Sequence, residues 1–545
     1  MKRVILAIAV ALAGAVYWML AQPAPPPLAA LFPPGAAIYL EAKDFGALVA
    51  DWNGSAEKAA WLTSANYDQF SRSRLFLRLA QAQTEFAAAA GVPPDYALAQ
   101  SLAGGNSALA IYNIGELQFL YIARLAQARA INSALWKARG SYQTRRAGGV
   151  DYYIREDAAS RRVAAFADAG GLLIVATKED LIAGALELLA QPRAALASEA
   201  WFRDATQAAS NGNDLRLVYN VERLRASPQF RSYWIQRNSR ALAEFSSGLA
   251  DLERASGEIR ERRVLLRANP GPPAEESAAG IVLAAVPDDA GFYRAWSHPD
   301  AAQAGRMIQE KIFAAAAAPA AQPRTAPLAL ITPDAGSEQD LETRIDEAPL
   351  ADDRQARAFR SLQDRLATAR LDAMLQVEST RAGDVFVGTE SAVVLLADSP
   401  WDAAAVRVAF ADAAGSLWSV GGIGALDGLG KIALDIDGRW LIAGNSADLV
   451  KAIAARRNRA AGPGAAYAAG WRHGRELPDF ERITGLIDFP QVPPAADPAA
   501  AREPMFFSEN LGSVGRVLSR LQSAEIVLHD SGAMLRENVV YRMAP

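Results

Sequence analysis

The feature that most constrains this chain is a strand–turn–helix pattern that occurs once in each half. Gly170–Leu189 reads GGLLIVATKEDLIAGALELL, and the segment from Gly438 reads GRWLIAGNSADLVKAIAA. In each copy a buried strand enters a helix through a polar turn, with Thr177 or Asn445 as the predicted N-cap and an Asp three residues later. Recurrence of one supersecondary pattern is the sequence signature of a duplicated architecture.

Other segments recur in the same order. Ile38–Leu40 and Ile281–Leu283 both read as a strand that leads to a helix, ending near Trp52 and near Trp296. Each half also has a long predicted helix, with Leu75, Leu79 and Phe86 on one face in the first half and Phe359, Leu362 and Leu366 in the second. Paired strands follow, 109–112 with 119–123 in the first half and 385–387 with 393–396 in the second. The first half closes on a strand at 264–267, and the second on a hairpin of 526–528 with 539–542 that turns at 530–532.

These patterns predict an α+β protein made of two tandem, internally homologous α/β units. Each unit is expected to have a mostly antiparallel sheet with helices on one side. The predicted organisation is an N-terminal membrane segment and Pro-rich linker (1–27), a first repeat (28–268), a breaker-rich linker (269–279), and a second repeat (280–545) with Ala/Pro-rich insertions near 314–327 and 492–504.

The N-terminus predicts export. Lys2 and Arg3 precede an uncharged run from Val4 to Ala21, long enough to span a thin bilayer at ~1.5 Å per residue. The basic pair would stay cytoplasmic, which predicts a single-pass inner-membrane protein whose bulk is periplasmic. The alternative is a signal peptide cleaved at Ala13-Gly14-Ala15. In both cases the rest of the chain lies outside the cytoplasm.

Composition excludes several kinds of chemistry. The chain has no cysteine, which removes disulfides, thiolate catalysis, zinc–thiolate sites and lipoprotein attachment. Its formal net charge is −4, and no basic stripe interleaved with aromatic residues occurs, so nucleic-acid binding is not expected. At 545 residues, 51% of them apolar, the chain should form several folded cores.

The three histidines do not form a convincing catalytic group. Asp288 and Asp289 precede His298 in VPDDAGFYRAWSHPD, a set that could bind a metal or transfer protons. Helix capping by the two aspartates, with His298 before the helix-stopping Pro299, explains the whole pattern and is the preferred interpretation. His473 is expected in a solvated loop, and His529 is expected to be exposed at a hairpin turn.

The remaining candidate motifs do not match any known binding or catalytic pattern. The glycines at 421–424 and Gly430-Lys431 match neither a phosphate loop nor a dinucleotide fingerprint. Asp435-Ile436-Asp437-Gly438 resembles part of a calcium loop but lacks the later ligands. The sequence therefore predicts no catalytic, cofactor-binding or metal-ligating residue, and no cofactor.

Three segments together resemble a known family: LFPPGAAIYLEAKDFGAL, GGNSALAIYN and SAEIVLHDSGAMLRENVVYR. They are similar to uncharacterised bacterial envelope proteins with an N-terminal membrane helix and a large exported domain of unknown function. The resemblance covers about Leu31 to Arg542. It implies an envelope location and carries over no functional residue.

Three functions follow as hypotheses. The first is a non-enzymatic binding or assembly protein, tethered to the inner membrane through residues 4–21, whose partner is an envelope protein or a large ligand. The second is a periplasmic hydrolase whose carboxylates meet only in the fold, ~5–9 Å apart. The third is a carrier for a lipid or another apolar ligand, which requires a dry cavity between sheet and helices.

Overall fold

The fold was analysed in a computed structural model that describes residues 26–93, 95–125, 130, 132–208, 213–230, 242–313, 353–382, 387–414, 418–422, 430–487, 515 and 517–544. The chain divides into two compact units, one formed by residues 1–54 and 73–251 and the other by 55–72 and 252–545. Their boundary at 251/252 precedes the linker predicted at 269–279. The predicted insertions at 314–327 and 492–504 lie outside the described residues.

The first unit is built on a sheet whose strands run in the order β8-β1-β2-β3-β7-β6-β5-β4, every neighbouring pair antiparallel. Its strands are β1 (Ile38–Ala42), β2 (Ser107–Asn113), β3 (Gln118–Arg124), β4 (Gln143–Ala147), β5 (Val150–Glu156), β6 (Val163–Ala169), β7 (Leu172–Ala176), β8 (Leu215–Asn220) and most of β9 (Phe245–Ala255). Its helices are η1 (Leu28–Leu31), α2 (Phe45–Gly54), α5 (Arg74–Ala90), α6 (Tyr96–Leu102), α8 (Ala134–Ala138), η2 (Arg139–Ser141), α9 (Glu179–Ala190), η3 (Leu196–Ser198), α10 (Ala200–Gln207) and α11 (Val221–Ala226).

In the second unit the strand order is β10-β19-β18-β17-β11-β12-β13-β16-β15-β14, with β14 and β15 the one parallel pair among the described strands. Its strands are β10 (Glu258–Arg267), β11 (Phe292–Ser297), β12 (Leu371–Ala382), β13 (Val387–Ala397), β14 (Trp418–Gly422), β15 (Gly430–Asp437), β16 (Trp440–Gly444), β17 (Tyr467–Trp471), β18 (Leu521–Asp530) and β19 (Met534–Met543). Its helices are α3 (Ala56–Leu62), α4 (Ala65–Ser71), α14 (Ser277–Leu283), α15 (Ala301–Ile308), η4 (Gln309–Phe313), α17 (Asp353–Ala367), α18 (Ala403–Ala414), α19 (Ala447–Ala454) and α20 (His473–Ile487).

The predicted arrangement of two tandem, internally homologous units is wrong. The strands of each unit form a large, almost wholly antiparallel sheet, and no tandem repeat is shown in the described residues. The segment expected to close the first repeat, now β10, lies in the second unit and pairs with the C-terminal strand β19. Local strand–turn–helix patterns specify elements, but they do not specify which strands pair.

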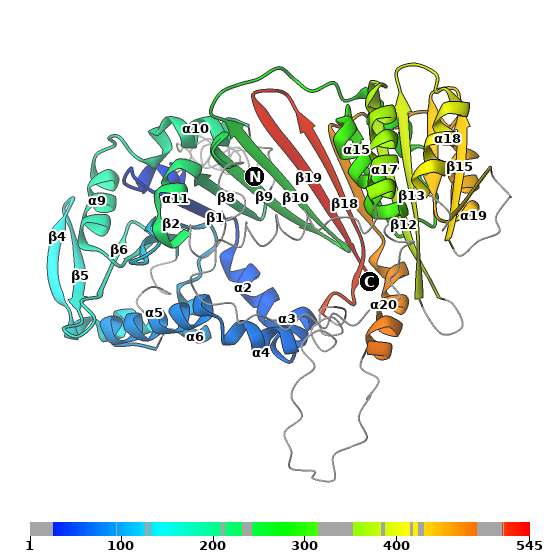
Figure 1. Ribbon diagram of the computed structural model, residues 1–545. Helices are drawn as coiled ribbons and strands as arrows, with labels where there is room; N and C mark the ends of the chain where they lie inside the picture. Colours follow the sequence, from blue (N-terminus) through cyan, green and yellow to red (C-terminus); the bar gives the residue numbers. More distant parts are fainter. Residues whose placement is uncertain are drawn as a thin grey trace, which may run out of the picture. The chain divides into compact units, whose positions relative to one another are not determined.

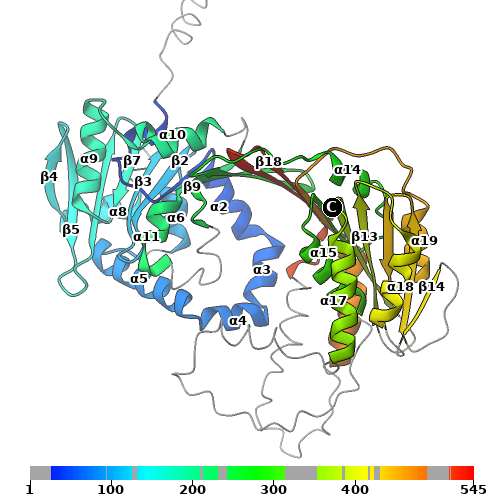
Figure 2. The same cartoon turned by 45° about the horizontal axis from the view of Figure 1, so that its top comes forward.

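Helices also cover both faces of the sheet rather than one. Five consecutive residues of β7 are buried, as are the last seven of β13 (391–397). Such runs are typical of strands covered on both faces. In the second unit α15, α17 and α18 pack on one face of β12 and β13, where Figure 1 shows α15 and α17, and α14 and α19 pack on the other. In the first unit α5 and α9 both pack against β6. Figure 2 shows these two helices beside the strands of this unit.

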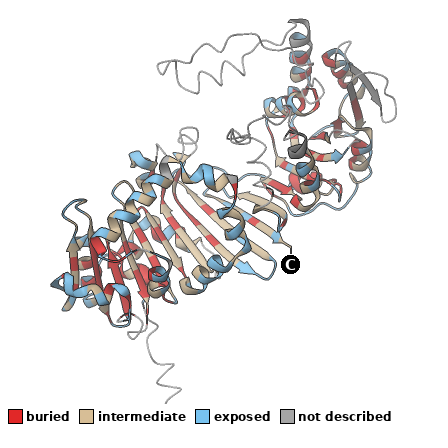
Figure 3. Cartoon of the chain, turned by 90° about the horizontal axis from the view of Figure 1, so that it is seen from below, coloured by how far each residue is buried: buried red, intermediate tan, exposed pale blue. Residues whose placement is uncertain are grey.

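Some strands are much less covered. Most residues of β10, β18 and β19 are only partly buried, and Figure 3 shows the strands near the C-terminus mainly in the intermediate colour. The two units therefore contain densely packed cores and, in the second unit, a set of strands with accessible side chains.

Two segments adopt the opposite structure from that predicted. The run Ile281–Leu283, expected to be a strand, ends helix α14, and the expected helix before Trp296 is strand β11. The helix is also a place of close tertiary contact: a Cβ on Gly280 would lie only 2.4 Å from the Gly462 carbonyl oxygen, so the two backbones approach closely there.

No helix among the described residues is both long and apolar enough to cross a bilayer. The span predicted at Val4–Ala21 lies outside those residues.

Candidate functional site

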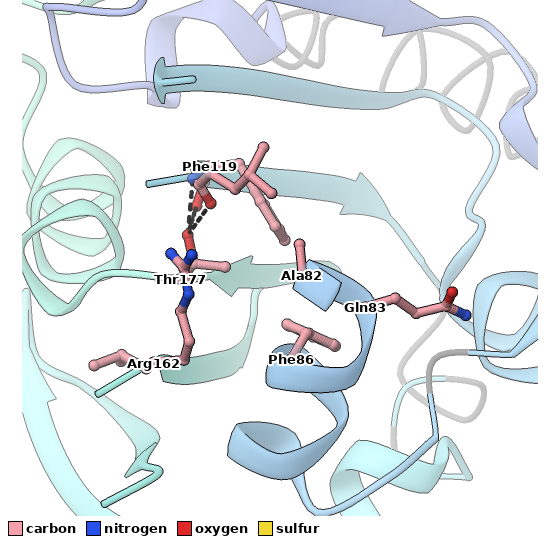
Figure 4. A pocket seen from close by; sticks show the side chains of 8 residues that line it. Ala82, Gln83, Phe86, Phe119, Arg162 and Thr177 are labelled. Atoms are coloured by element: carbon pink, nitrogen blue, oxygen red, sulfur yellow. Dashed lines mark hydrogen bonds between the residues drawn. The ribbon is translucent and has the colours of Figure 1, made fainter. Parts of the chain in front are cut away.

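An apolar pocket of about 200 Å³ lies between α5 and the strands of the first unit (Figure 4). We call it the α5 pocket. It is larger than the ~150 Å³ engineered apolar cavity that holds benzene. Its lining residues come from α5, the β2–β3 turn, β3, and the adjacent ends of β6 and β7: Ala82, Gln83, Phe86, Leu117, Phe119, Arg162, Val163 and Thr177.

Helix α5 is fixed at both ends, which places its lining residues. The Ser73 hydroxyl accepts a hydrogen bond from the Phe76 amide (3.2 Å), as an N-cap should. The helix ends at Gly91, whose φ of 68° suits glycine, and the Tyr142 hydroxyl donates to the Ala90 carbonyl (2.6 Å). Ala82 and Phe86, one turn apart, therefore face the strands.

Aromatic and aliphatic groups make up the walls. The rings of Phe86 and Phe119 lie 6.3 Å apart between centroids, at an interplanar angle of 35°. Ala82, Leu117 and Val163 complete the apolar lining. Such a lining offers dispersion contacts and no catalytic group.

Arg162, which lies at the rim of the pocket, belongs to a chain of polar and charged groups. Arg162 donates from Nε to Glu85 Oε2 (2.7 Å), Gln81 donates to Glu85 Oε1 (2.8 Å), and Arg78 lies 3.6 Å from the same carboxylate. The hydrogen bond from Arg162 holds the pKa of Glu85 below its usual range. Glu85 is therefore ionised and paired, so the rim provides no general acid.

Thr177 has a different role from the one predicted. Its hydroxyl accepts a hydrogen bond from the Phe119 amide (2.8 Å) and lies 3.1 Å from the Leu117 carbonyl oxygen (Figure 4). The N-cap of α9 is Lys178, which makes no side-chain cap. Thr177 thus ties β7 to β3 at the pocket instead of capping the helix.

The prediction that Asn445 caps a helix is wrong for the same reason. Its side chain accepts from the Ser391 amide (2.7 Å) and donates to the Thr389 carbonyl (2.9 Å), while Ser446 caps α19. In both places a backbone amide of the neighbouring strand needs a hydrogen-bond acceptor. The polar side chain accepts from that amide instead of capping the helix.

The β2–β3 turn, residues 114–117, carries backbone strain. Leu117 has φ of 50°, which costs an L-residue about 1–2 kcal/mol. The turn is held by Arg78, which donates to the Gly115 carbonyl (3.3 Å), and by Arg162, which donates to the Glu116 carbonyl. Strained residues that are held from several sides are frequent at ligand sites.

Asp288, Asp289 and His298, which the sequence offered as a candidate metal or proton-transfer site, do not come together in the structure. Asp288 and Asp289 lie in a turn before a strand, so neither caps a helix. Asp288 pairs with Arg456 and lies 3.9 Å from Arg459, whereas His298 Nε2 lies 3.4 Å from Glu275. The described part of the chain contains no group of three or more side chains suited to a metal ion.

The other motifs have structural roles. Asp435 and Asp437, from the calcium-like fragment, both pair with Arg457, at 2.8 and 2.7 Å. His529 lies within β18, partly buried, with Nδ1 2.7 Å from Glu276. Residues 423–429 of the glycine-rich segment lie outside the described residues.

His473 is buried, not solvated as predicted. It begins α20, its side chain is 3% exposed, and its ring lies 4.5 Å from that of Trp471. Neither ring nitrogen has a hydrogen-bond partner within the described structure. Burial lowers the pKa of His473, so the folded state keeps the imidazole neutral.

This burial predicts acid sensitivity. The unfolded chain takes up a proton at about pH 6.5, whereas the folded chain does so only at lower pH, so stability falls as pH decreases below about 6.5. One such group lowers the free energy of unfolding by at most about 1.4 kcal/mol for each pH unit. We expect His473→Phe, which keeps the ring contact with Trp471, to flatten this slope in urea unfolding between pH 7 and 5. Equal slopes for both proteins would contradict the assignment.

A polar pocket of about 400 Å³ in the first unit bears on the hydrolase hypothesis. It is lined by two carboxylates, Glu156 and Glu179, among other residues. Glu156 pairs with Arg161 (2.9 Å), and Glu179 binds Arg145 and the Tyr152 hydroxyl. The Tyr152 hydrogen bond lowers the pKa of Glu179, the opposite of what a catalytic acid requires.

A second apolar pocket of about 360 Å³ lies on β11, β17 and β18 in the second unit. Phe292, Trp471 and Ile526 line it together with small residues (Ala469, Gly470 and Ala524). Apolar recesses thus occur in both units, each on a different part of the chain.

Comparison with known proteins gives no family. No family model matches the chain, and no curated protein matches it. Among solved structures, crystal form I of TP0453 is 12% identical, with TM-score 0.24, over 46% of this chain and 81% of that one. Crystal form III is 11% identical, with TM-score 0.26, over 49% and 89%. These scores are too low to establish a shared fold.

Proposed function

We propose that this protein is a non-enzymatic binding protein of the cell envelope whose α5 pocket takes an apolar ligand. The observation that carries the proposal is the apolar lining of that pocket, whose charged lining residue, Arg162, is already paired with Glu85. Pockets of this kind bind through burial of apolar surface, at about 25 cal/mol per Å². The envelope location rests on the N-terminal sequence.

The hydrolase hypothesis has less support. The described pocket that holds two carboxylates has both of them paired with arginine, and the pKa of Glu179 is lowered. A binding role needs neither a nucleophile nor an acid, and it agrees with the side chains that line the α5 pocket.

Filling the α5 pocket tests the proposal. We expect Ala82→Phe, which directs a ring into the pocket, to lower the affinity for fluorobenzene at least about tenfold, or ~1.4 kcal/mol. Binding is followed by fluorine NMR on the full-length protein in detergent. The small neutral probe matches the pocket volume.

Ala88→Phe is the matched control, because Ala88 lies on the same helix and is exposed. It should leave the affinity within about twofold. If fluorobenzene binds wild type and Ala82→Phe equally, or binds neither, the α5 pocket is not the ligand site.

A further inference from the structure

A polar pocket of about 550 Å³ adjoins the α5 pocket in the first unit. We call it the Tyr112 pocket. Its lining includes Tyr112, Asn113, Glu116, Arg223, Ser227 and Gln229. It therefore contains hydroxyl, amide and carboxylate groups where the α5 pocket has methyl groups and rings. The Tyr112 hydroxyl donates to the Pro33 carbonyl (2.8 Å) and the Ser227 hydroxyl to Gln229 Oε1 (3.3 Å), so a ligand would meet the remaining acceptor and amide positions.

The β2–β3 turn is the wall between the two pockets. Ile114, Gly115 and Glu116 line the Tyr112 pocket, and the next residue, Leu117, lines the α5 pocket. The Leu117 amide lies 3.4 Å from the Ile114 carbonyl oxygen, so the ends of this turn are within about 7 Å of each other. Consecutive residues of one tight turn thus line both pockets.

Residues on both sides of the β2–β3 turn hold it in place. Arg78 and Arg162 bind its carbonyl groups on the side of the α5 pocket. On the other side Gln229 packs so closely that a Cβ on Gly115 would lie 2.4 Å from Nε2. The Asn113 side chain also accepts from the Glu116 amide (3.1 Å). The strained Leu117 backbone is thus fixed by residues of both pockets.

The charges of the Tyr112 pocket indicate which polar group it suits. Arg223 is already neutralised by Glu199, with contacts of 2.6 and 3.2 Å, and it also donates to the Ala36 carbonyl (2.8 Å). The other charged lining residue, Glu116, is an exposed carboxylate. This balance disfavours an anionic group and favours a neutral one that can hydrogen-bond to amides and hydroxyls.

We propose that the ligand is an amphiphile whose apolar tail enters the α5 pocket and whose neutral, hydroxyl-rich head, such as a sugar, occupies the Tyr112 pocket. This inference rests on the proposed function, because the α5 pocket must first bind an apolar group. It adds the chemical class of the head and the residues that select it.

Titration calorimetry of the full-length protein with three eight-carbon probes tests the inference. Octanol reports the tail alone, octyl glucoside adds a neutral sugar, and octanoate adds a negative charge. We expect octyl glucoside to bind at least about tenfold more tightly than octanol, as one or two net hydrogen bonds would give, and octanoate to bind more weakly than octyl glucoside.

Ser227→Ala should lower the octyl glucoside affinity about threefold to tenfold and leave octanol within about twofold. Gln229→Ala should lower the octyl glucoside affinity at least as much, but octanol is no control for it, because Gln229 also packs against the turn that carries Leu117. Gln191→Ala, an exposed position at the end of α9, is the matched control and should change neither. Thermal unfolding of each variant identifies any that fail to fold. Because the Ser227 hydroxyl donates to Gln229 Oε1 (3.3 Å), the two variants test one hydrogen-bonded pair, and the comparison of the three probes on wild type is the independent test.

The outcomes separate the two proposals. Binding of octanol with no preference for octyl glucoside overturns the assignment of the head and leaves the apolar site intact. Failure of both octanol and octyl glucoside to bind overturns the proposed function itself. A preference for octanoate would identify an anionic head and contradict the charge argument.

Discussion

Phe166→Ala lowers the free energy of unfolding of the first unit by about 3–5 kcal/mol, the largest single-residue effect that we expect. Phe166 lies in the middle of β6 with 1% of its surface exposed. Its ring contacts Tyr142 edge-on at 5.1 Å and stacks on Tyr153 at 5.2 Å. The substitution removes these aromatic contacts and leaves a cavity that packed neighbours cannot fill.

Urea unfolding followed by tryptophan fluorescence measures this effect, since Trp136 lies 6.3 Å from the Phe166 ring. Phe480→Ala is the matched control: the same atoms are removed from a side chain that is 41% exposed. The control substitution should lower the free energy of unfolding by less than about 1 kcal/mol. Equal costs at the two positions would mean that β6 is not at the centre of a packed core.

Asp251→Ala should lower the free energy of unfolding by about 3 kcal/mol. Asp251, in β9, is 1% exposed and binds Arg216 of β8 through both oxygens, at 2.6 and 2.8 Å. The same hydrogen bonding raises the pKa of Arg216. Removing the carboxylate leaves a largely buried guanidinium without its main counter-charge, which costs more than the pair itself contributes.

Two variants give this prediction its controls. Glu187→Ala breaks the exposed pair with Arg193 and should change stability by less than about 1 kcal/mol. The double substitution Arg216→Met with Asp251→Leu should recover most of the loss, because no unpaired charge remains. If Asp251→Ala is as mild as Glu187→Ala, the buried pair is not formed.

Elements with a strong local signal could be predicted. Strand β1 with helix α2, the β2–β3 hairpin, and the β18–β19 hairpin with its turn at 530–532 all occur where the sequence indicates. In each, alternation or helical periodicity agrees with turn residues at the ends. These elements need little help from tertiary contacts.

Sheet pairing and helix placement could not be predicted in the same way. The sequence suggested that 385–387 pairs with 393–396, yet Val387 and 393–396 belong to the same strand, β13, whose partners are β12 and β16. The pairing of β10 with β19 joins residues more than 250 positions apart, such as Val264 with Arg536. No local pattern specifies such a contact.

The candidate site was even less accessible from sequence. Phe86 was identified as part of an apolar helix face, and it lines the α5 pocket. Leu79, assigned to the same face, is instead exposed. Val163 and Thr177 reach the pocket from strand ends far along the chain, and only an excess of apolar residues on α5 could have hinted at a recess there.

The most direct measurement is native mass spectrometry of the full-length protein purified from its own host envelope, compared with the Ala82→Phe variant prepared identically. We expect wild type to carry a small molecule that the variant has lost, with a mass that fits an amphiphile. Bare protein in both preparations, or the same adduct on both, would contradict an apolar ligand site beneath α5.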